Sequence, residues 1–283
     1  MKLKNILVTI GALGLGLALT GGVTAAASTS YVNAKSGNFL IAKKKIVLAK
    51  TKYKKAFTIP KGTIVQISGV TTLKGKRIMD IQMDSLSYHL RKSYVGKNET
   101  STRNIVMKKT DFKKVSVPQY LRYYSTQKSY PENIGLNATQ DGSLFAGLKY
   151  PDANNESTAK AARIHVSSDG YLEYYANTAV FSVGVDPKPT TSVKVTKAAL
   201  PSGSGKTYLY TKQAVPSAIG KRVSKSGSAQ YLTVIKRQYT TYTTTYATER
   251  NKDVTSSIRV SCGYLVNGTH YYMPTAIFYP QAN

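Results

Sequence analysis

Short strand-forming runs separated by turns dominate this chain and limit what it can fold into. In the first third of the sequence, β-branched and aliphatic residues gather at 46–49, 63–67 and 78–81. Gly62 and Gly75, each preceded by a lysine, mark turns between these runs. Helical periodicity is weak throughout and allows isolated turns of helix at most. The sequence therefore predicts an all-β fold.

The turn at residues 168–170 is specific enough to predict a strand register. Its Ser-Asp-Gly sequence forms a three-residue hairpin loop if Gly170 takes the left-handed conformation. That loop sets Val166 opposite Leu172, so that two apolar side chains meet, whereas a two-residue turn would place Val166 against Glu173. We therefore predict the longer loop.

A second hairpin is predicted close to the C-terminus. Asn267-Gly268 is a strong type I′ signal, because both residue types tolerate a positive φ angle. A two-residue loop at this position pairs Tyr264 with Tyr271. Thr and Tyr dominate residues 239–246, a composition that suits a half-exposed strand.

The charge of the chain is large and unevenly distributed. Its 283 residues include 40 Lys and Arg but 13 Asp and Glu, an imbalance that by itself favours disorder. A hydrophobic content of 41% argues instead for a folded chain. Residues 28–117 carry a net charge of +16, residues 118–190 carry −1 and residues 191–283 carry +10. Two basic blocks therefore flank a neutral one.

The borders between these blocks coincide with prolines, which favour extended connectors. Pro118 lies at the first border, and Pro187 and Pro189 lie at the second. We therefore predict β modules in tandem, one for each block, with the second and third sandwich-like.

The first 27 residues have the pattern of a secretory signal peptide. Lys2 and Lys4 give a positive start, residues 6–19 form an apolar run, and residues 25–27 are the small residues that a signal peptidase needs. The apolar run is shorter than the about 20 residues that a membrane span requires. We therefore expect that residues 1–27 are cleaved and that the secreted chain has no membrane span. An uncleaved N-terminal anchor is the alternative.

Four segments of the first basic block form one pattern: the run at 46–49, the turn and strand at 59–65, the Lys-Gly-Lys hairpin at 73–78 and the Tyr-containing stretch at 88–95. This pattern resembles the cationic SH3-like modules of surface-layer and other cell-surface proteins of lactobacilli and other Gram-positive bacteria. The resemblance implies a small SH3-like barrel that closes with a Tyr-Val strand and holds the protein to the wall, often through teichoic acids. This chain departs from the pattern after the hairpin, where Arg-Ile replaces a Tyr pair.

Lysines crowd the first block with no acidic residue among them. Between Lys35 and Arg77 there is no Asp or Glu, so mutual repulsion destabilises a compact fold unless a polyanion or salt offsets it. The abundant polyanions outside a Gram-positive cell are phosphodiester wall polymers and anionic lipid headgroups. For any single lysine, the alternative is an ordinary solvated surface. The predicted polyanion-binding residues are Lys43, Lys44, Lys45, Lys50, Lys52, Lys54, Lys55, Lys61, Lys74, Lys76, Arg77, Arg91 and Lys92.

The tyrosines allow two interpretations. Each ring offers an apolar face and a polar tip, so a sugar-stacking groove could be lined by Tyr208, Tyr210, Tyr264 and Tyr271. The alternative is that these rings pack a β core that lacks tryptophan. Basic residues interleaved with aromatics also suit nucleic acid, but secretion argues against that partner.

No set of residues predicts catalysis. The run at 202–207 lacks the first glycine and the helix of a phosphate-binding loop. The hairpin register places Cys262 opposite Met273 and several residues along the strand from His270, which favours a buried, inert thiol over a cysteine enzyme. The three histidines show no metal-ligand spacing. We therefore expect no enzyme activity, no metal and no cofactor.

Taken together, these features predict a non-catalytic protein, secreted and associated with the cell wall. Its basic blocks are expected to bind anionic, teichoic acid-like wall polymers without a covalent link, while the neutral block faces outward. One alternative is an adhesin that binds host sulfated glycans or mucin, and another is a wall-active cysteine enzyme.

Overall fold

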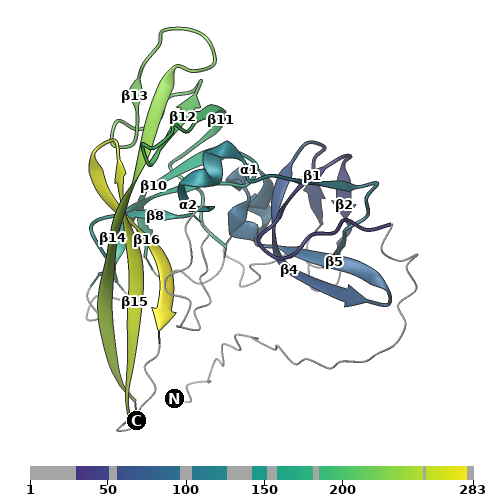
Figure 1. Cartoon of the computed structure of the whole chain (residues 1–283), viewed down its shortest axis with the longest axis horizontal. Helices are drawn as coiled ribbons and strands as arrows, with labels where there is room; N and C mark the ends of the chain where they lie inside the picture. Colours follow the sequence, from purple (N-terminus) through teal and green to yellow (C-terminus); the bar gives the residue numbers. More distant parts are fainter. Residues whose placement is uncertain are drawn as a thin grey trace.

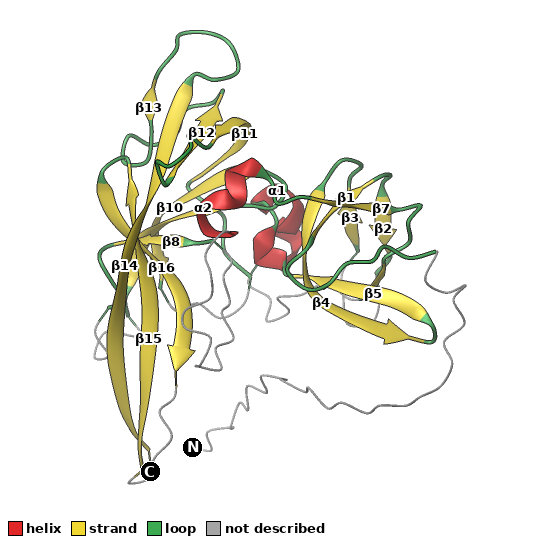
Figure 2. Ribbon diagram, in the orientation of Figure 1, coloured by secondary structure: helices red, strands yellow, loops and turns green. Residues whose placement is uncertain are grey.

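The computed structural model describes residues 30–50, 56–95, 104–125, 142–151, 158–180, 185–250 and 253–278. These residues are mostly β-strand, which confirms the predicted all-β fold. Figures 1 and 2 show a smaller N-terminal module and a larger C-terminal sheet, with short helices between them. The predicted signal peptide lies outside the described residues. No helix in the described part of the chain is long and apolar enough to cross a membrane.

The N-terminal module is a five-stranded antiparallel sheet with a two-stranded hairpin beside it. The sheet has the order β6-β5-β4-β1-β7, and β2 pairs with β3. Leu40 of the sheet and Ile59 of the hairpin belong to one buried core. The strands are β1 (Phe39–Ala42), β2 (Ile46–Leu48), β3 (Phe57–Ile59), β4 (Ile64–Leu73), β5 (Lys76–Ile81), β6 (Ile105–Val106) and β7 (Phe112–Val115).

Lysine-glycine turns connect the strands of this module, as the sequence predicts. Lys74 and Gly75 have φ angles of 50° and 73° and join β4 to β5, with Leu73 opposite Lys76. Gly62, with a φ of 83°, lies in the turn between β3 and β4. Glycine suits these positions because it adopts a positive φ without steric strain.

The Tyr-Val strand that the resemblance implies at 88–95 is not present. The structure has two helical turns there, α1 (Tyr88–Arg91) and η3 (Lys92–Tyr94), preceded by η2 (Met83–Ser85). The physical reason is tertiary: the backbone N–H groups of Ser87, just before α1, and of Tyr88, its first residue, donate to the carboxylates of Asp169 and Glu173 in the C-terminal sheet region. A pattern in the local sequence does not include these distant partners, so it does not predict the helical turns.

The C-terminal sheet contains nine strands and closes on itself. Its order is β12-β11-β10-β9-β8-β16-β15-β14-β13, and β12 also pairs with β14. We call it the closed sheet. Its strands are β8 (Leu144–Ala146), β9 (Lys160–Val166), β10 (Tyr171–Ala179), β11 (Thr191–Ala199), β12 (Lys206–Thr211), β13 (Lys221–Arg222), β14 (Tyr231–Arg250), β15 (Asp253–Val266) and β16 (Thr269–Phe278).

The core of the closed sheet also receives side chains from the segment that precedes it. Two short helices, η4 (Gln119–Leu121) and α2 (Arg122–Ser125), follow β7. Leu121 and Tyr123 are buried in the same cluster as strand residues of the sheet. The hydroxyl of Tyr264 donates to the backbone carbonyl of Tyr123 at 3.1 Å. The proline border at 118 is therefore followed directly by core residues.

The predicted division between residues 118–190 and 191–283 is corrected by the sheet topology. β10 and β11 are hydrogen-bonded neighbours across residue 190, with Leu172 opposite Val193. Within the described residues the strands of the neutral block are β8, β9 and β10, and the block's apolar side chains share one core with those of the last block. The two blocks therefore form one sheet, not two sandwich-like modules.

Both hairpin registers predicted from turn residues are confirmed. Val166 lies opposite Leu172, and the glycine of the Ser-Asp-Gly loop has a φ of 81°. Tyr264 lies opposite Tyr271, and the Asn-Gly turn between them has φ angles of 49° and 91°. Local turn chemistry was sufficient to fix these pairings.

A polar network, which we call the joint, connects the N-terminal module to the closed sheet. Ser87, the residue before α1, donates its backbone N–H and its hydroxyl to the two carboxylate oxygens of Asp169, at 2.8 and 2.6 Å. The backbone N–H of Ser168 donates to the carbonyl of Ser85 at 2.7 Å. The β9–β10 loop is thus tied to the residues that precede α1.

Arg91 and Glu173 lie at the centre of the joint. Both side chains are completely buried, and Nη2 of Arg91 lies 2.9 Å from Oε2 of Glu173. The Tyr175 hydroxyl accepts a hydrogen bond from Arg91 and donates to the same carboxylate oxygen at 2.9 Å. The backbone N–H of Tyr88 and the hydroxyl of Ser192 donate to Oε1. A buried charge is tolerated only with such partners.

A second ion pair extends the joint to the second proline border. Arg163 lies 2.6 Å from Asp186, and both side chains are about 5% exposed. The backbone N–H of Asp186 donates to Asp84 at 2.9 Å. Because Asp186 directly precedes the proline segment, the connector expected there begins from a packed residue.

Candidate functional site

Two lysine-rich segments lie side by side on the N-terminal module. β1 and β7 are antiparallel neighbours with Ala42 opposite Phe112, and the backbone N–H of Lys43 donates to the carbonyl of Asp111 at 2.7 Å. Lysines after β1 therefore meet lysines within and just before β7. We call six exposed lysines of this group the basic face: Lys43, Lys44, Lys45, Lys109, Lys113 and Lys114.

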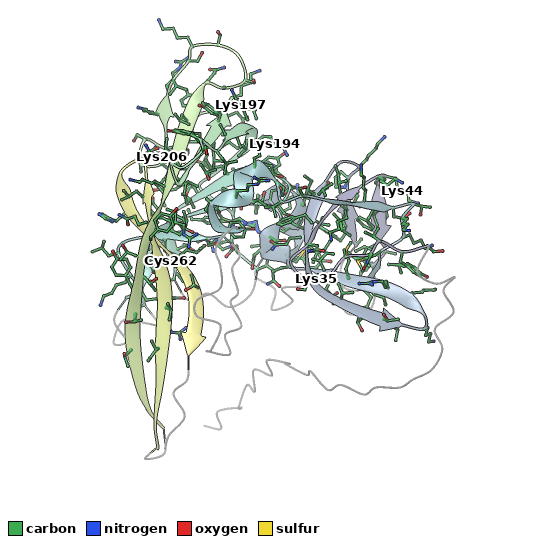
Figure 3. All side chains as sticks on the ribbon, in the orientation of Figure 1. Lys35, Lys44, Lys194, Lys197, Lys206 and Cys262 are labelled. Atoms are coloured by element: carbon green, nitrogen blue, oxygen red, sulfur yellow. The ribbon has the colours of Figure 1, made fainter. Side chains whose placement is uncertain are left out.

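A shallow hollow of about 350 Å³ lies within the basic face. Buried side chains of Val32 and Phe112 contribute apolar atoms to its lining. Asn33 and four lysines of the basic face contribute its polar lining. Figure 3 shows Lys44 on the side of the N-terminal module away from the closed sheet. The hollow therefore combines several cations with a small apolar surface.

Asp111 supplies the one ion pair that the basic face makes within the described residues. Its carboxylate lies 2.7 Å from Nζ of Lys44. Partial burial raises the pKa of Asp111, but the hydrogen bonds from Lys44 and Thr110 outweigh that effect, so the pKa lies below its ordinary value. One carboxylate among six lysines leaves the face strongly positive.

The other predicted lysines that the structure describes lie outside the basic face. Lys50, Lys61 and Lys92 are exposed elsewhere on the module, and Lys74 and Lys76 lie at the end of the β4–β5 hairpin that projects in Figure 2. The predicted residues outside the described part of the chain are Lys52, Lys54 and Lys55.

The prediction that Arg91 binds an external polyanion is wrong. Its side chain is 0% exposed and lies in the joint, where Nη2 contacts Glu173 and Tyr175 and Nε lies 3.6 Å from the Asp84 carboxylate. Burial lowers the pKa of Arg91, but Glu173 and Tyr175 outweigh that effect and keep the guanidinium charged.

Arg77 is also partly committed to the fold. It is half-buried, and its Nη2 donates to the backbone carbonyl of Ala34 at 2.6 Å. A second, longer contact of 3.5 Å joins its Nη1 to the side chain of Asn33. Arg77 therefore fastens the chain before β1 rather than extending freely into solvent.

The four candidate sugar-stacking tyrosines separate into two pairs. Tyr264 and Tyr271 are 0% and 2% exposed and lie in the core of the closed sheet, so their proposed role in an open groove is wrong. Burial raises the pKa of Tyr271 to about 12. Tyr208 and Tyr210 are half-buried on β12, on the opposite face from the core residue Leu209.

Sequence reasoning missed Lys109, Lys113 and Lys114 of the basic face. Together with the neighbouring Lys108 they contribute to the net charge of the first block, but their spacing alone shows no link to Lys43. The available signal was two Lys-Lys pairs on either side of Phe112, a buried residue in a strand-forming run. Only the β1–β7 pairing brings them to the first lysine cluster.

The groups considered for catalysis do not meet. Cys262 is buried opposite Met273, as the register predicts, and Figure 3 labels it within the closed sheet. His270 is exposed beside the turn of that hairpin, opposite Leu265 and three residues along β16 from Met273. Within the described residues no group of three metal-ligating side chains is assembled.

Comparison of the chain with protein-family models, with curated proteins and with solved structures finds no match.

Proposed function

We propose that the chain is a non-catalytic, secreted cell-surface protein that attaches without a covalent link to anionic, teichoic acid-like polymers of the cell wall. The observation that carries this proposal is the basic face, where six exposed lysines from two distant segments surround one carboxylate. Like charges gathered on one surface repel one another, and a polyanion offsets that repulsion.

Attachment through the basic face has a specific physical signature. Lysine is a compact point charge on a flexible stem, so a group of lysines suits a repeating phosphodiester better than one fixed carboxylate. Binding releases counterions from the polymer, by analogy with basic proteins on nucleic acid. Affinity then depends on the number of lysines at one place more than on the total charge of the chain.

The test compares two variants of the full chain with equal charge changes. One carries Glu at Lys43, Lys45, Lys109, Lys113 and Lys114. The matched control carries Glu at five other exposed lysines, Lys149, Lys160, Lys188, Lys221 and Lys225. Each is incubated with purified Gram-positive walls, with and without extraction of teichoic acid.

We expect the unaltered chain to sediment with intact walls and to be lost from extracted walls. The basic-face variant should stay in solution, and the control variant should retain most of its binding. Equal loss in both variants would show that only total charge matters. Full retention on extracted walls would contradict the proposal, and preferential binding to sulfated glycans or mucin would favour the host-adhesin alternative.

A further inference from the structure

The outer face of β12 carries two tyrosines between lysines. Side chains alternate across a strand, so Lys206, Tyr208 and Tyr210 share one face, while Thr207 and Leu209 are buried on the other. The two rings are half-buried. They lie two residues apart on a strand that pairs with β11 on one side and with β14 on the other.

The neighbouring strands add cations and apolar surface to the same face. On β11, Lys197 lies opposite Tyr210, with Nζ 5.5 Å from the ring centroid. On β14, Val234 lies opposite Tyr208 and is half-buried. Figure 3 shows Lys197 and Lys206 on this part of the closed sheet. We call this group the β12 face: Lys197, Lys206, Tyr208, Tyr210, Lys212 and Lys236.

The β12 face contains an unfavourable pair of like charges. Lys206 and Lys236 lie directly opposite each other in the β12–β14 ladder. Directly opposed like charges destabilise a sheet. After Asp186 the sequence contains only two acids, Glu249 and Asp253, and both lie at the far end of the β14–β15 hairpin. Their positions in the β14–β15 ladder are therefore far along the strand from Lys236.

We propose that the β12 face binds the sugar-bearing part of an anionic wall polymer. Tyr208 and Tyr210 offer apolar ring faces on which sugar rings stack. Lys197, Lys206 and Lys236 meet the phosphate groups beside those sugars, and their neutralisation relieves the like-charge pair. This inference rests on the proposed function and gives it a second, sugar-selective surface.

The joint holds the basic face and the β12 face in a fixed arrangement on one chain. The Arg91–Glu173 pair and the Ser87–Asp169 contacts hold the N-terminal module against the closed sheet. The basic face and the β12 face are therefore parts of one folded body. Once one surface binds a polymer, the other meets that polymer at a high effective concentration.

The experiment uses the full chain and two probes: poly(glycerol phosphate) that carries sugar substituents, and the same polymer without them. The variant is Tyr208→Ala with Tyr210→Ala, and the matched control is Tyr208→Phe with Tyr210→Phe, which keeps both rings. We expect the Ala variant to lose about tenfold in affinity for the sugar-bearing polymer, as removal of ring contacts predicts, and to bind the bare polymer unchanged. The Phe variant should bind both probes like the unaltered chain.

A second variant keeps the test valid if the Ala variant folds poorly. Lys206→Glu replaces the like-charge pair with an opposite-charge pair, so a merely structural role predicts higher stability and unchanged binding. The proposal predicts higher stability but weaker binding of the sugar-bearing polymer. Unchanged affinity in the Ala and Glu variants would overturn the β12 face while leaving the basic face intact.

Other outcomes distinguish a failure of the β12-face inference from a failure of the proposed function. An equal loss of affinity for both polymers in the Ala variant would show that the tyrosines do not recognise the sugar substituents. If the Ala substitutions weakened binding of single-stranded DNA but not of either polymer, the face would be a nucleic-acid surface. If reversal of the basic-face lysines left binding of the bare polymer unchanged, the proposed function would fail instead.

Discussion

The basic face and the joint both depend on charge, but they use it in opposite ways. In the basic face, six exposed lysines share one carboxylate, Asp111. In the joint, Arg91 and Glu173 are fully buried and each finds several partners. The first region leaves charge available to a ligand, whereas the second uses charge to fix one part of the chain against another.

The difference shows that a charged residue gains its role from its tertiary neighbours. Arg91 and Lys92 are adjacent in the sequence, yet one is buried in the joint and the other is exposed. An exposed cation is largely hydrated and screened, so its loss costs the fold little. A buried charge that loses its partner keeps its desolvation cost and destabilises the fold strongly.

The largest expected effect therefore lies in the joint. Arg91→Ala should lower the free energy of unfolding by about 3–5 kcal/mol, because it leaves the Glu173 carboxylate buried and without its cation. Lys92→Ala, the neighbouring control, should change it by less than about 0.5 kcal/mol. Urea unfolding of both variants measures these values. A loss below about 1 kcal/mol for Arg91→Ala would contradict the contrast between the two regions.

A double variant sharpens this prediction. Arg91→Met combined with Glu173→Gln removes both charges while keeping similar volumes and an acceptor for the Tyr88 N–H. We expect the double variant to lose less stability than the two single changes added together, since the double variant leaves no lone buried ion, whereas each single change leaves one. Strictly additive losses would mean that the pair is not coupled.

Local features of the fold could be predicted from the sequence, and long-range ones could not. The Ser-Asp-Gly and Asn-Gly turns fixed their hairpins because the required φ angles select the loop length. The closure of the sheet through β12 and β14, and the β10–β11 pairing across residue 190, depend on contacts that composition does not encode. Pro118 lies between the last strand of the N-terminal sheet and the core of the closed sheet, whereas Pro187 and Pro189 lie between two paired strands of one sheet.

The candidate site shows the same limit. The lysines after β1 were predicted, but their neighbours around Phe112 became visible only through the β1–β7 pairing. Tyr264 and Tyr210 are the same residue type on strands, and burial alone separates the core ring from the surface ring. Residue type indicates the chemistry that is available, and the tertiary fold decides whether solvent reaches it.

The smallest expected effect concerns Asp111. Its pKa is lowered in the folded state, so its ionised form stabilises the fold above the pKa of the unfolded chain, and this contribution is lost as the pH falls through the folded-state pKa. Asp111→Asn should cost at most about 1 kcal/mol at neutral pH, because Lys44 is largely exposed, and the cost should shrink as the pH falls through the folded-state pKa. Thermal unfolding across this pH range checks the prediction. A cost that persists at the lowest pH would point to packing instead of charge.

The salt dependence of polymer binding tests the central claim most directly. The dissociation constant for bare poly(glycerol phosphate) should be measured from low to molar salt for the unaltered chain and for a variant with Gln at Lys43, Lys45, Lys109, Lys113 and Lys114. We predict that affinity falls steeply with salt, and that the slope of log Kd against log salt is smaller by about 3 in the variant, by analogy with about 0.7 per phosphate contact on single-stranded nucleic acid. Equal slopes for the two proteins, or binding that survives molar salt, would contradict attachment through the basic face.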